Sequence, residues 1–367
     1  MGVTLVSVDH HITHIDFSRK NIEVVKVNNL EEFYKKVREF LLKDYDLIIS
    51  DEDPDGITSV IIYYLFKKKT VNFEGNRKGL NNEDLKRFET LGIKFILSFD
   101  WFALNTSDLD IFEKIIYLNP INSNLINVNT SEITYRSLPE TKKIGRDISV
   151  IGTICDYLVD NCKDKFKEFI EDYKDLFSEL VDLVKEGKLD RYNAYSFNGN
   201  KTLFYDLSLM FWAPFIIEGD EGNKKLIDIV VNNKNFNIRN LLNENNYLRE
   251  MLIQLNSLIE NEKENFYKNR KVIGNLNFYN LTTHKNGFTS KFSSIIADEL
   301  PKNLIVVMKD NSSDKIKYSL RTRSNDYNLG KTLADLNVGG GHVKAAGCVI
   351  DINKEEWFEN ELMKRFK

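Results

Sequence analysis

The sequence Asp-Glu-Asp-Pro-Asp-Gly at residues 51–56 limits most strongly how this chain can fold. A largely apolar run at residues 47–50 precedes it, and residues 58–66 keep apolar side chains at helical spacing. We therefore expect a strand that ends in alternating carboxylates and turns through Gly56 into a helix. Asp51, Asp53 and Asp55 repel one another unless water or a metal ion neutralises them. The stretch is a candidate site for a hard divalent cation.

A structural interpretation of the same stretch is also available. A carboxylate before the first helical turn can accept hydrogen bonds from backbone N–H groups, and the helix dipole favours negative charge there. Asp51, Asp53 and Asp55 could therefore cap the helix without binding a metal.

Composition restricts the class of protein. The chain has 367 residues, 42% of them hydrophobic and 29% charged, which is typical of a globular protein long enough for two domains. It has no apolar run of membrane length and no signal peptide, so we expect no membrane association and a cytoplasmic location. The net charge of −4 predicts that nucleic acid would bind only in a local groove. Three cysteines are too few for a disulfide scaffold.

The first half of the chain alternates strands and helices. We expect strands at residues 3–8, 22–27, 46–50, 95–99 and 115–118, and helices at residues 30–43 and from Gly56 to about Lys69. Continuous apolar strands are typical of a buried parallel sheet. Asp100 and Asn119 follow two of these strands, and ligands of open α/β sheets bind beyond the carboxyl ends of the strands.

The second half changes character. Residues 148–156 form an apolar element that ends in Asp156, and residues 160–270 are charged and mostly helical, with one long helix at 242–267. Strands follow at 272–276, 304–307, 316–320 and 347–350, with helices at 291–299 and 329–336. We predict an α/β chain with a parallel-sheet lobe at residues 1–240, a linker helix at 241–270 and a smaller α+β lobe at 271–367.

A glycine-rich segment in the second lobe is a candidate anion site. Gly339, Gly340 and Gly341 allow backbone N–H groups to approach an anion, and His342 can donate a hydrogen bond to a phosphate. The alternative is a tight turn with no ligand. Cys155 and the aromatic residues around Trp212 are interpreted as core.

Four separate segments together resemble the DHH phosphoesterase superfamily, in the branch with a DHH-associated C-terminal domain (DHHA1). They are the acidic stretch at residues 51–56, Asp100, Gly152-Thr153-Ile154-Cys155-Asp156, and Gly339-Gly340-Gly341-His342 followed by Ala345-Ala346-Gly347. Their order and spacing match RecJ-type single-strand exonucleases and oligonucleotide phosphodiesterases of that family.

The resemblance implies a lobe that holds two Mn²⁺ or Mg²⁺ ions and a second lobe that grips nucleic acid. The ligand positions that survive here are Asp51, Asp53, Asp55, Asp100 and Asp156, with Asp53 and Asp55 as catalytic positions. The positions implied to contact substrate are Arg321, Arg323, Ser324, Gly339, Gly340, Gly341 and His342. Taken singly, Asp100, Asp156 and the two arginines could instead be ordinary residues of strand ends, helices and exposed strands.

The family's Asp-His-His motif is missing from its expected place, which reads Asn119-Pro120-Ile121. Proline and isoleucine side chains cannot bind a metal, and an asparagine amide is a poor ligand. A literal Asp9-His10-His11 occurs near the N-terminus, before the acidic stretch. We expect it to form an edge loop with exposed polar residues; the alternative is that it folds over the sheet and replaces the lost motif.

Three functions follow from the resemblance. The first is a RecJ-like protein that binds single-stranded DNA or RNA as a catalytically weakened subunit in DNA replication or repair, like archaeal RecJ-type partners of GINS proteins. The second is an active Mn²⁺- or Mg²⁺-dependent exonuclease or oligonucleotide phosphodiesterase. The third is a phosphatase or phosphodiesterase for small nucleotides, which would not need the basic track that a polymer requires.

Overall fold

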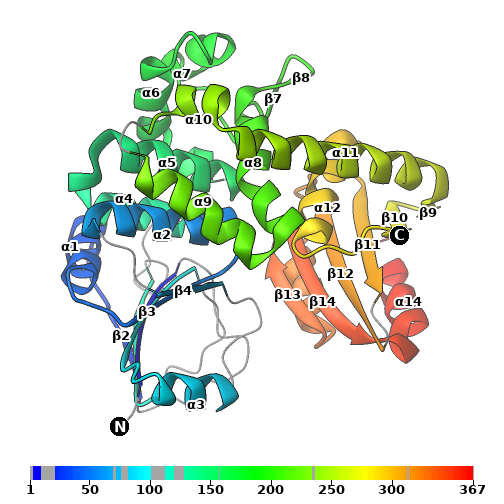
Figure 1. Cartoon of the computed structure of the whole chain (residues 1–367). Coiled ribbons are helices and arrows are strands. Elements are labelled where there is room, and N and C mark those ends of the chain that lie inside the picture. The colour runs from blue at the N-terminus through cyan, green and yellow to red at the C-terminus, as the bar shows by residue number, and fades with distance from the viewer. Residues whose placement is uncertain are drawn as a thin grey trace. The chain divides into compact units, whose positions relative to one another are not determined.

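The computed structural model describes residues 3–9, 21–68, 72–75, 82–100, 112–119, 128–156, 158–233, 236–311 and 314–366. The chain divides into two compact units, Met1–Leu252 and Ile253–Lys367. The first contains a parallel sheet and the second, the smaller unit, a mixed sheet (Figure 1), which confirms the expected fold class.

Six parallel strands form the sheet of the first unit. In spatial order they are β2 (Ile22–Val24), β6 (Lys114–Leu118), β1 (Thr4–Val8), β5 (Phe95–Phe99), β3 (Leu47–Ser50) and β4 (Asn72–Gly75). The N-terminal strand β1 therefore lies inside the sheet, where it pairs with β5 on one side and with β6 on the other. Strands β5 and β6 follow each other in the sequence but are not neighbours in the sheet.

Helices supply the rest of this unit. They are α1 (Leu30–Leu41), α2 (Pro54–Lys67), α3 (Asn82–Thr90), α4 (Thr130–Ser137), α5 (Lys142–Cys155), α6 (Lys163–Asp172), α7 (Val181–Lys185), α8 (Leu203–Glu218), α9 (Asp220–Asn232) and α10 (Ile238–Glu244). A two-stranded hairpin, β7 (Ser196–Phe197) and β8 (Asn200–Lys201), precedes α8. The long helix expected near residues 242–267 is α11 (Asn246–Asn269).

Both faces of the parallel sheet are buried. On one face, Phe88 of α3 packs in a cluster with alternate strand residues such as Leu47 and Ile96. On the other face, Tyr63 of α2 contacts Phe99 of β5, with ring centroids 5.8 Å apart. Burial on two sides explains why these strands are continuously apolar.

Helix α8 is buried around almost its whole circumference, and its residues include Trp212 and the neighbouring aromatic side chains. Trp212 is 8% exposed. The interpretation of this aromatic run as core is therefore confirmed.

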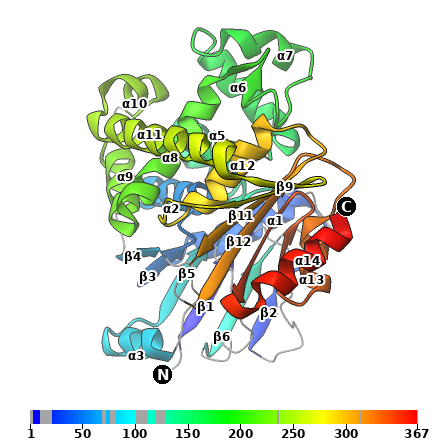
Figure 2. The ribbon, with the colours of Figure 1, turned by 90° about the vertical axis from the view of Figure 1, so that its right-hand side faces the viewer.

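The second unit is a six-stranded sheet between helices. The strand order is β13 (Gly339–His342), β14 (Ala345–Asp351), β12 (Lys315–Thr322), β11 (Ile305–Asn311), β10 (Leu276–Asn280) and β9 (Lys271–Ile273). Residues of α13 (Leu329–Asp335) and α14 (Glu355–Phe366) close the hydrophobic core on one face. Helix α12 (Phe288–Glu299) packs on β11 and β12 from the other face (Figure 2).

The single strand expected at residues 272–276 is wrong. A turn at Gly274 and Asn275 separates β9 from β10, and the two strands pair antiparallel with Ile273 opposite Leu276. Gly274 has a φ of 56°, in the left-handed region that glycine adopts without a Cβ clash. A glycine before an asparagine between two apolar strands is a hairpin signal that the periodicity alone does not reveal.

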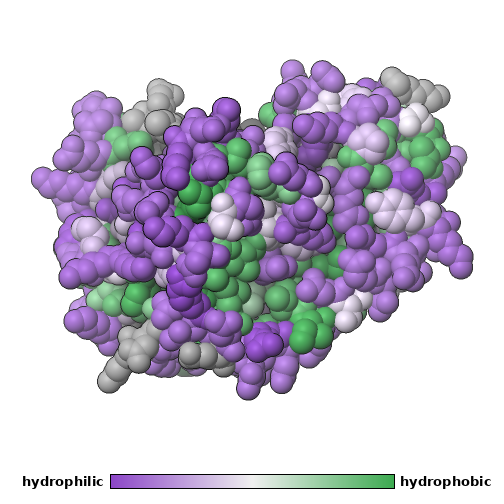
Figure 3. Space-filling view, turned by 90° about the horizontal axis from the view of Figure 1, so that it is seen from above, coloured by the Kyte–Doolittle hydropathy of each residue, from purple (hydrophilic) through white to green (hydrophobic). Residues whose placement is uncertain are grey.

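The surface seen from above is mostly hydrophilic, and apolar side chains gather only in small groups (Figure 3). In the described part of the chain, no helix has both the length and the apolar character that crossing a bilayer requires.

Glu262 gives a test of how α11 is held against the sheet and loops that follow it in the second unit. Its carboxylate is 1% exposed and accepts hydrogen bonds from Tyr279 Oη at 2.8 Å, Thr282 N at 2.7 Å, Thr282 Oγ1 at 2.7 Å and Thr283 Oγ1 at 2.7 Å. Glu262→Ala leaves the buried Tyr279 hydroxyl and the half-buried Thr283 hydroxyl without their acceptor, so we expect a loss of about 2 kcal/mol in the free energy of unfolding. Urea unfolding measures it.

The matched control is Glu264→Ala, because Glu264 is exposed on the same helix. We expect a change of less than about 0.5 kcal/mol for this control. Equal losses in the two variants would contradict an anchoring role for Glu262.

Candidate functional site

Four polar residues follow neighbouring strands at the carboxyl edge of the parallel sheet. The register pairs Val8 with both Phe99 and Leu118, and Ser50 with Phe99. The next residue on each strand therefore belongs to one row, in the order Asn119, Asp9, Asp100, Asp51. Adjacent strands lie about 4.8 Å apart, so the row brings three carboxylates and one amide together.

Asp9 is a central member of this row. Its side chain is 0% exposed, its backbone N–H donates to Leu118 O at 3.2 Å, and its Oδ2 accepts from Tyr117 Oη at 2.8 Å. Tyr117 Oη in turn accepts from Asn119 Nδ2 at 3.1 Å. Asn119 is therefore a buried hydrogen-bond donor beside Asp9.

The expectation that Asp9 belongs to an exposed edge loop is wrong. Residues 5–8 are buried and β1 is paired on both sides within the sheet, so the strand places Asp9 beside Asp100. His10, His11 and His14 lie outside the described residues, as do Pro120 and Ile121 of the degenerate motif.

Asp51 and Asp53 accept hydrogen bonds from backbone N–H groups at the turn from β3 into α2. Asp53 is the N-cap of α2, and its Oδ1 accepts from the N–H groups of Asp55 at 3.1 Å and Gly56 at 3.2 Å. Asp51 Oδ1 accepts from the N–H of Glu52 at 2.6 Å. The capping interpretation therefore holds for Asp53, which does not prevent its other oxygen from binding a ligand.

Gly56 explains how tightly this turn is closed. A Cβ at this position would lie 2.6 Å from Asp51 O and would also overlap Ser50 Oγ. Only glycine allows the first turn of α2 to lie so close to the strand end. Gly152 serves a similar purpose on α5, where a Cβ would overlap Thr58 Oγ1 and Ser131 Oγ.

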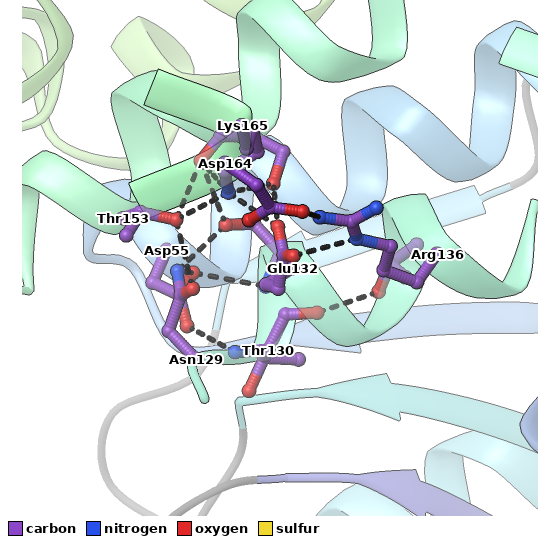
Figure 4. A network of polar contacts seen from close by, with 11 residues as sticks. Asp55, Asn129, Thr130, Glu132, Arg136, Thr153, Asp164 and Lys165 are labelled. Atoms are coloured by element: carbon purple, nitrogen blue, oxygen red, sulfur yellow. Dashed lines mark hydrogen bonds and ion pairs between the residues drawn. The ribbon is translucent and has the colours of Figure 1, made fainter. Parts of the chain in front are cut away.

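Asp55 points into the protein and caps a different helix. Its carboxylate is 0% exposed and accepts hydrogen bonds from the N–H of Thr130 at 2.8 Å, the N–H of Ser131 at 3.0 Å and Asn129 Nδ2 (Figure 4). Thr130 and Ser131 are the first residues of α4, whose own N-cap residue Asn129 makes no side-chain cap. Asp55 therefore satisfies N–H groups that begin α4.

Asp100 is joined to the same helix end. Its Oδ1 accepts from Thr130 Oγ1 at 3.1 Å, and its N–H donates to Val8 O at 2.9 Å. Its φ of 52° lies in the left-handed region, which aspartate tolerates but seldom adopts. A strained backbone of this kind persists only where the surrounding structure holds it in place, and it occurs most often at functional sites.

Asp156 follows the last turn of α5 as its C-cap, and its N–H donates to Gly152 O at 3.2 Å. Its side chain is partly exposed.

Among the described residues, no three His, Cys, Asp or Glu side chains converge closely enough to form a metal site by themselves.

A buried ion pair lies behind α4. Lys165 of α6 is paired with Glu132 of α4, and their side chains are 1% and 3% exposed. Burial alone would raise the pKa of Glu132, but the charges of Lys165 and Arg136 outweigh it and hold this pKa below its usual range. Arg136 Nε donates to Glu132 at 2.8 Å, so the carboxylate has two cationic partners.

Comparison with known proteins identifies the fold. Residues 278–367 match the sequence model of the DHHA1 domain, and a search of curated proteins finds no match. A crystal structure of the exonuclease RecJ bound to manganese is 15% identical with a TM-score of 0.55, and the alignment covers 93% of this chain and 95% of that one. The chain has the DHH–DHHA1 fold of RecJ-like proteins.

Two further solved structures share the DHH–DHHA1 fold or its DHH part. RecJ from Thermus thermophilus in complex with Mn²⁺ is 14% identical with a TM-score of 0.59, and the alignment covers 94% of this chain and 55% of that one. The DHH domain of a member of the s1p family of ribosomal proteins is 13% identical with a TM-score of 0.59, with 92% and 91% covered.

The ligand atoms at the carboxyl edge of the parallel sheet suit the metal ions of the RecJ structures. Asp9, Asp51, Asp53 and Asp100 offer only oxygen ligands, which Mg²⁺ and Mn²⁺ prefer. Mg²⁺ is commonly held by one or two carboxylates together with water and substrate phosphates. A pair of carboxylates from this row therefore fits such an ion without a complete protein cage.

The arginines of the DHHA1 domain are tied to α12. Arg321 Nε donates to Ser294 Oγ at 3.0 Å and its Nη2 to Ser290 Oγ at 2.7 Å. Arg323 forms an ion pair with Asp298. Ser324 Oγ donates to Asp326 at 2.8 Å. Each of these side chains therefore has a structural partner within its own unit.

The segment Gly339–His342 is an edge strand, β13, and the interpretation as a turn is wrong. It pairs antiparallel with β14, and His342 lies opposite Ala345. Gly341 has a φ of 142°, and a Cβ there would lie 2.7 Å from Ala346 Cα. Glycine is therefore needed for close pairing, and the strand stays exposed along most of its length.

Sequence reasoning did not select Asn129, Thr130, Glu132 and Lys165. A signal was present, because Asn129 followed three residues later by Glu132 is typical of a helix start. No local pattern indicates that Asp55, 74 residues earlier than Asn129, supplies the cap.

We expect Asp55→Ala to destabilise the protein even in the absence of metal. The substitution leaves the buried N–H groups of Thr130 and Ser131 without their acceptor, which costs about 3 kcal/mol. Asp51→Ala should change the free energy of unfolding by less than about 1 kcal/mol, because Asp51 is partly exposed. Urea unfolding in EDTA measures both variants, and equal stability would contradict the capping role.

Proposed function

We propose that this protein is a divalent-metal-dependent phosphodiesterase that acts on single-stranded DNA or RNA. The observation that carries the proposal is the position of Asp9, between Asp100 and Asn119 at the carboxyl edge of the sheet. Asp9 supplies a buried carboxylate beside the place where the degenerate motif has only an amide. The DHHA1 domain and the likeness in fold to RecJ support a nucleic-acid substrate.

Asp9, Asp51, Asp53 and Asp100 are the residues that would hold Mn²⁺ or Mg²⁺. A bound ion of this kind lowers the pKa of water and stabilises the departing oxygen of a phosphodiester. Asp55 and Asp156 complete the expected ligand set, but Asp55 acts first as the cap of α4.

Two hydroxyl groups orient the carboxylates at this edge of the sheet. The hydroxyl of Thr130 holds Asp100 at 3.1 Å, and the Tyr117 hydroxyl holds Asp9 at 2.8 Å. In the DHHA1 domain, Arg321, Arg323, Ser324 and the exposed strand of Gly339–His342 are the candidates for contact with the nucleic acid.

A second candidate is a subunit that binds single strands without cutting them, in replication or repair, with GINS-type proteins as partners. Two observations favour it: Asn119 stands where the family places a carboxylate, and Asp55 is engaged in three hydrogen bonds to α4. Both candidates predict single-strand binding that weakens steeply with salt. They differ only in whether the protein cleaves the bound strand.

Incubation with a fluorescently labelled single strand and Mn²⁺ tests the proposal. We expect shortening of the strand by the wild type, none in EDTA, and at least a roughly 100-fold slower rate for Asp9→Asn, because the substitution removes a charged ligand but keeps an acceptor for Tyr117. Asp44→Asn is the matched control, since the Asp44 side chain is 84% exposed.

The outcomes separate the two candidates. A wild type that binds the strand but never shortens it, at any Mn²⁺ concentration, would overturn the phosphodiesterase proposal and favour the binding subunit. Activity unchanged in Asp9→Asn would remove Asp9 from the site.

A further inference from the structure

A continuous chain of hydrogen bonds leads from the buried ammonium of Lys165 to the carboxylate of Asp55 (Figure 4). Lys165 Nζ donates to Thr153 Oγ1 at 2.7 Å, and Thr153 Oγ1 donates to Asn129 Oδ1 at 2.9 Å. Asn129 Nδ2 then donates to Asp55 Oδ1. The four side chains come from α6, α5, the start of α4 and α2, and each is at most 1% exposed.

The charge of Lys165 gives this chain its direction. An ammonium group can only donate, so Thr153 Oγ1 accepts from Lys165 and has one proton left to give. That proton lies within reach of Asn129 Oδ1 and of Ser149 O, which is 2.8 Å away. When it goes to Asn129, the amide oxygen faces Thr153 and the NH₂ group faces Asp55.

The orientation of the Asn129 amide matters to Asp55. If the amide turned over, its oxygen would face the carboxylate, and two acceptors would meet in a buried place with no donor between them. The present orientation gives Asp55 a third donor in addition to the N–H groups of Thr130 and Ser131. Thr130 links the two carboxylates, because its backbone N–H donates to Asp55 and its Oγ1 donates to Asp100.

The Lys165–Glu132 pair is poorly explained by stability alone. Removing two charges from water is expensive, and apolar replacements of buried ion pairs are often neutral or stabilising. The pair does, however, place a permanent donor beside Thr153, which an apolar side chain cannot do.

We propose that Thr153 and Asn129 are positioning residues that hold Asp55 and, through Thr130, Asp100 in the orientation required to bind a divalent cation, with Lys165 as the fixed donor that sets their direction. This inference rests on the proposed metal-dependent function. Partners of metal ligands commonly change metal affinity about 10- to 100-fold when they are removed.

Thr153→Val is the decisive variant, because it replaces the hydroxyl by a methyl group of similar size and leaves Lys165 and Glu132 paired. Thr153→Ser restores the hydroxyl. Thr134→Val is the matched control: Thr134 is equally buried, and its hydroxyl donates at 2.9 Å to Thr130 O within α4, outside the chain from Lys165. Substitution of Lys165 itself is unsuitable, since it would leave Glu132 buried without its main partner.

Two measurements are made on the full-length protein. Calorimetric titration gives the affinity for Mn²⁺, and we expect Thr153→Val to weaken it about 10- to 100-fold, with Thr153→Ser and Thr134→Val within about threefold of the wild type. NMR of ¹⁵N-asparagine-labelled protein without metal reports the Asn129 side-chain amide, whose signal should shift in Thr153→Val and not in Thr134→Val.

The two measurements separate the two proposals. Wild-type protein that binds no Mn²⁺ would overturn the metal-dependent function, and the Asn129 signal then decides the positioning role alone. An Asn129 signal unchanged in Thr153→Val would overturn the positioning role. The same holds if Thr134→Val weakens Mn²⁺ binding as much as Thr153→Val.

Discussion

The backbone pairing of β1 with both β5 and β6 is the constraint on which the rest of the first unit depends. An unpaired strand edge inside a buried sheet would leave N–H and C=O groups without partners, so both sides of β1 must be matched in register. That register fixes which residues share the carboxyl edge. It places Asp9 between Asp100 and Asn119, and it separates β5 from β6, which are consecutive in the sequence.

Local sequence patterns predicted the elements well where the signal itself is local. The apolar run of β3, the cap at Asp53 and the apolar spacing of α2 lie close together in the sequence, so periodicity and capping rules suffice for them. The same holds for the burial of α8 and the start of α11 near Asn246. Gly274 was misjudged, because a two-residue turn within an apolar stretch scarcely alters the pattern.

The position of Asp9 could not be predicted from the sequence, because strand order is a long-range property. Consecutive strands usually lie side by side, which would have put β5 beside β6 and β1 at an edge. The partnership of Asp55 with α4 is long-range in the same way. In the DHHA1 domain, Arg321 and Arg323 show a further limit: the residue type indicates a cation, but only the structure shows that α12 provides its partners.

The central place of β1 also has a consequence for how the chain folds. Strand β1 must wait for partners about ninety and one hundred and ten residues further along before either of its edges is paired. Contacts of such sequence separation slow folding, because loop closure is required before they contribute. Until then, both edges of β1 are open and can pair with other chains. During synthesis, this lobe therefore has a period of exposure to aggregation that a sheet with β1 at its edge would not have.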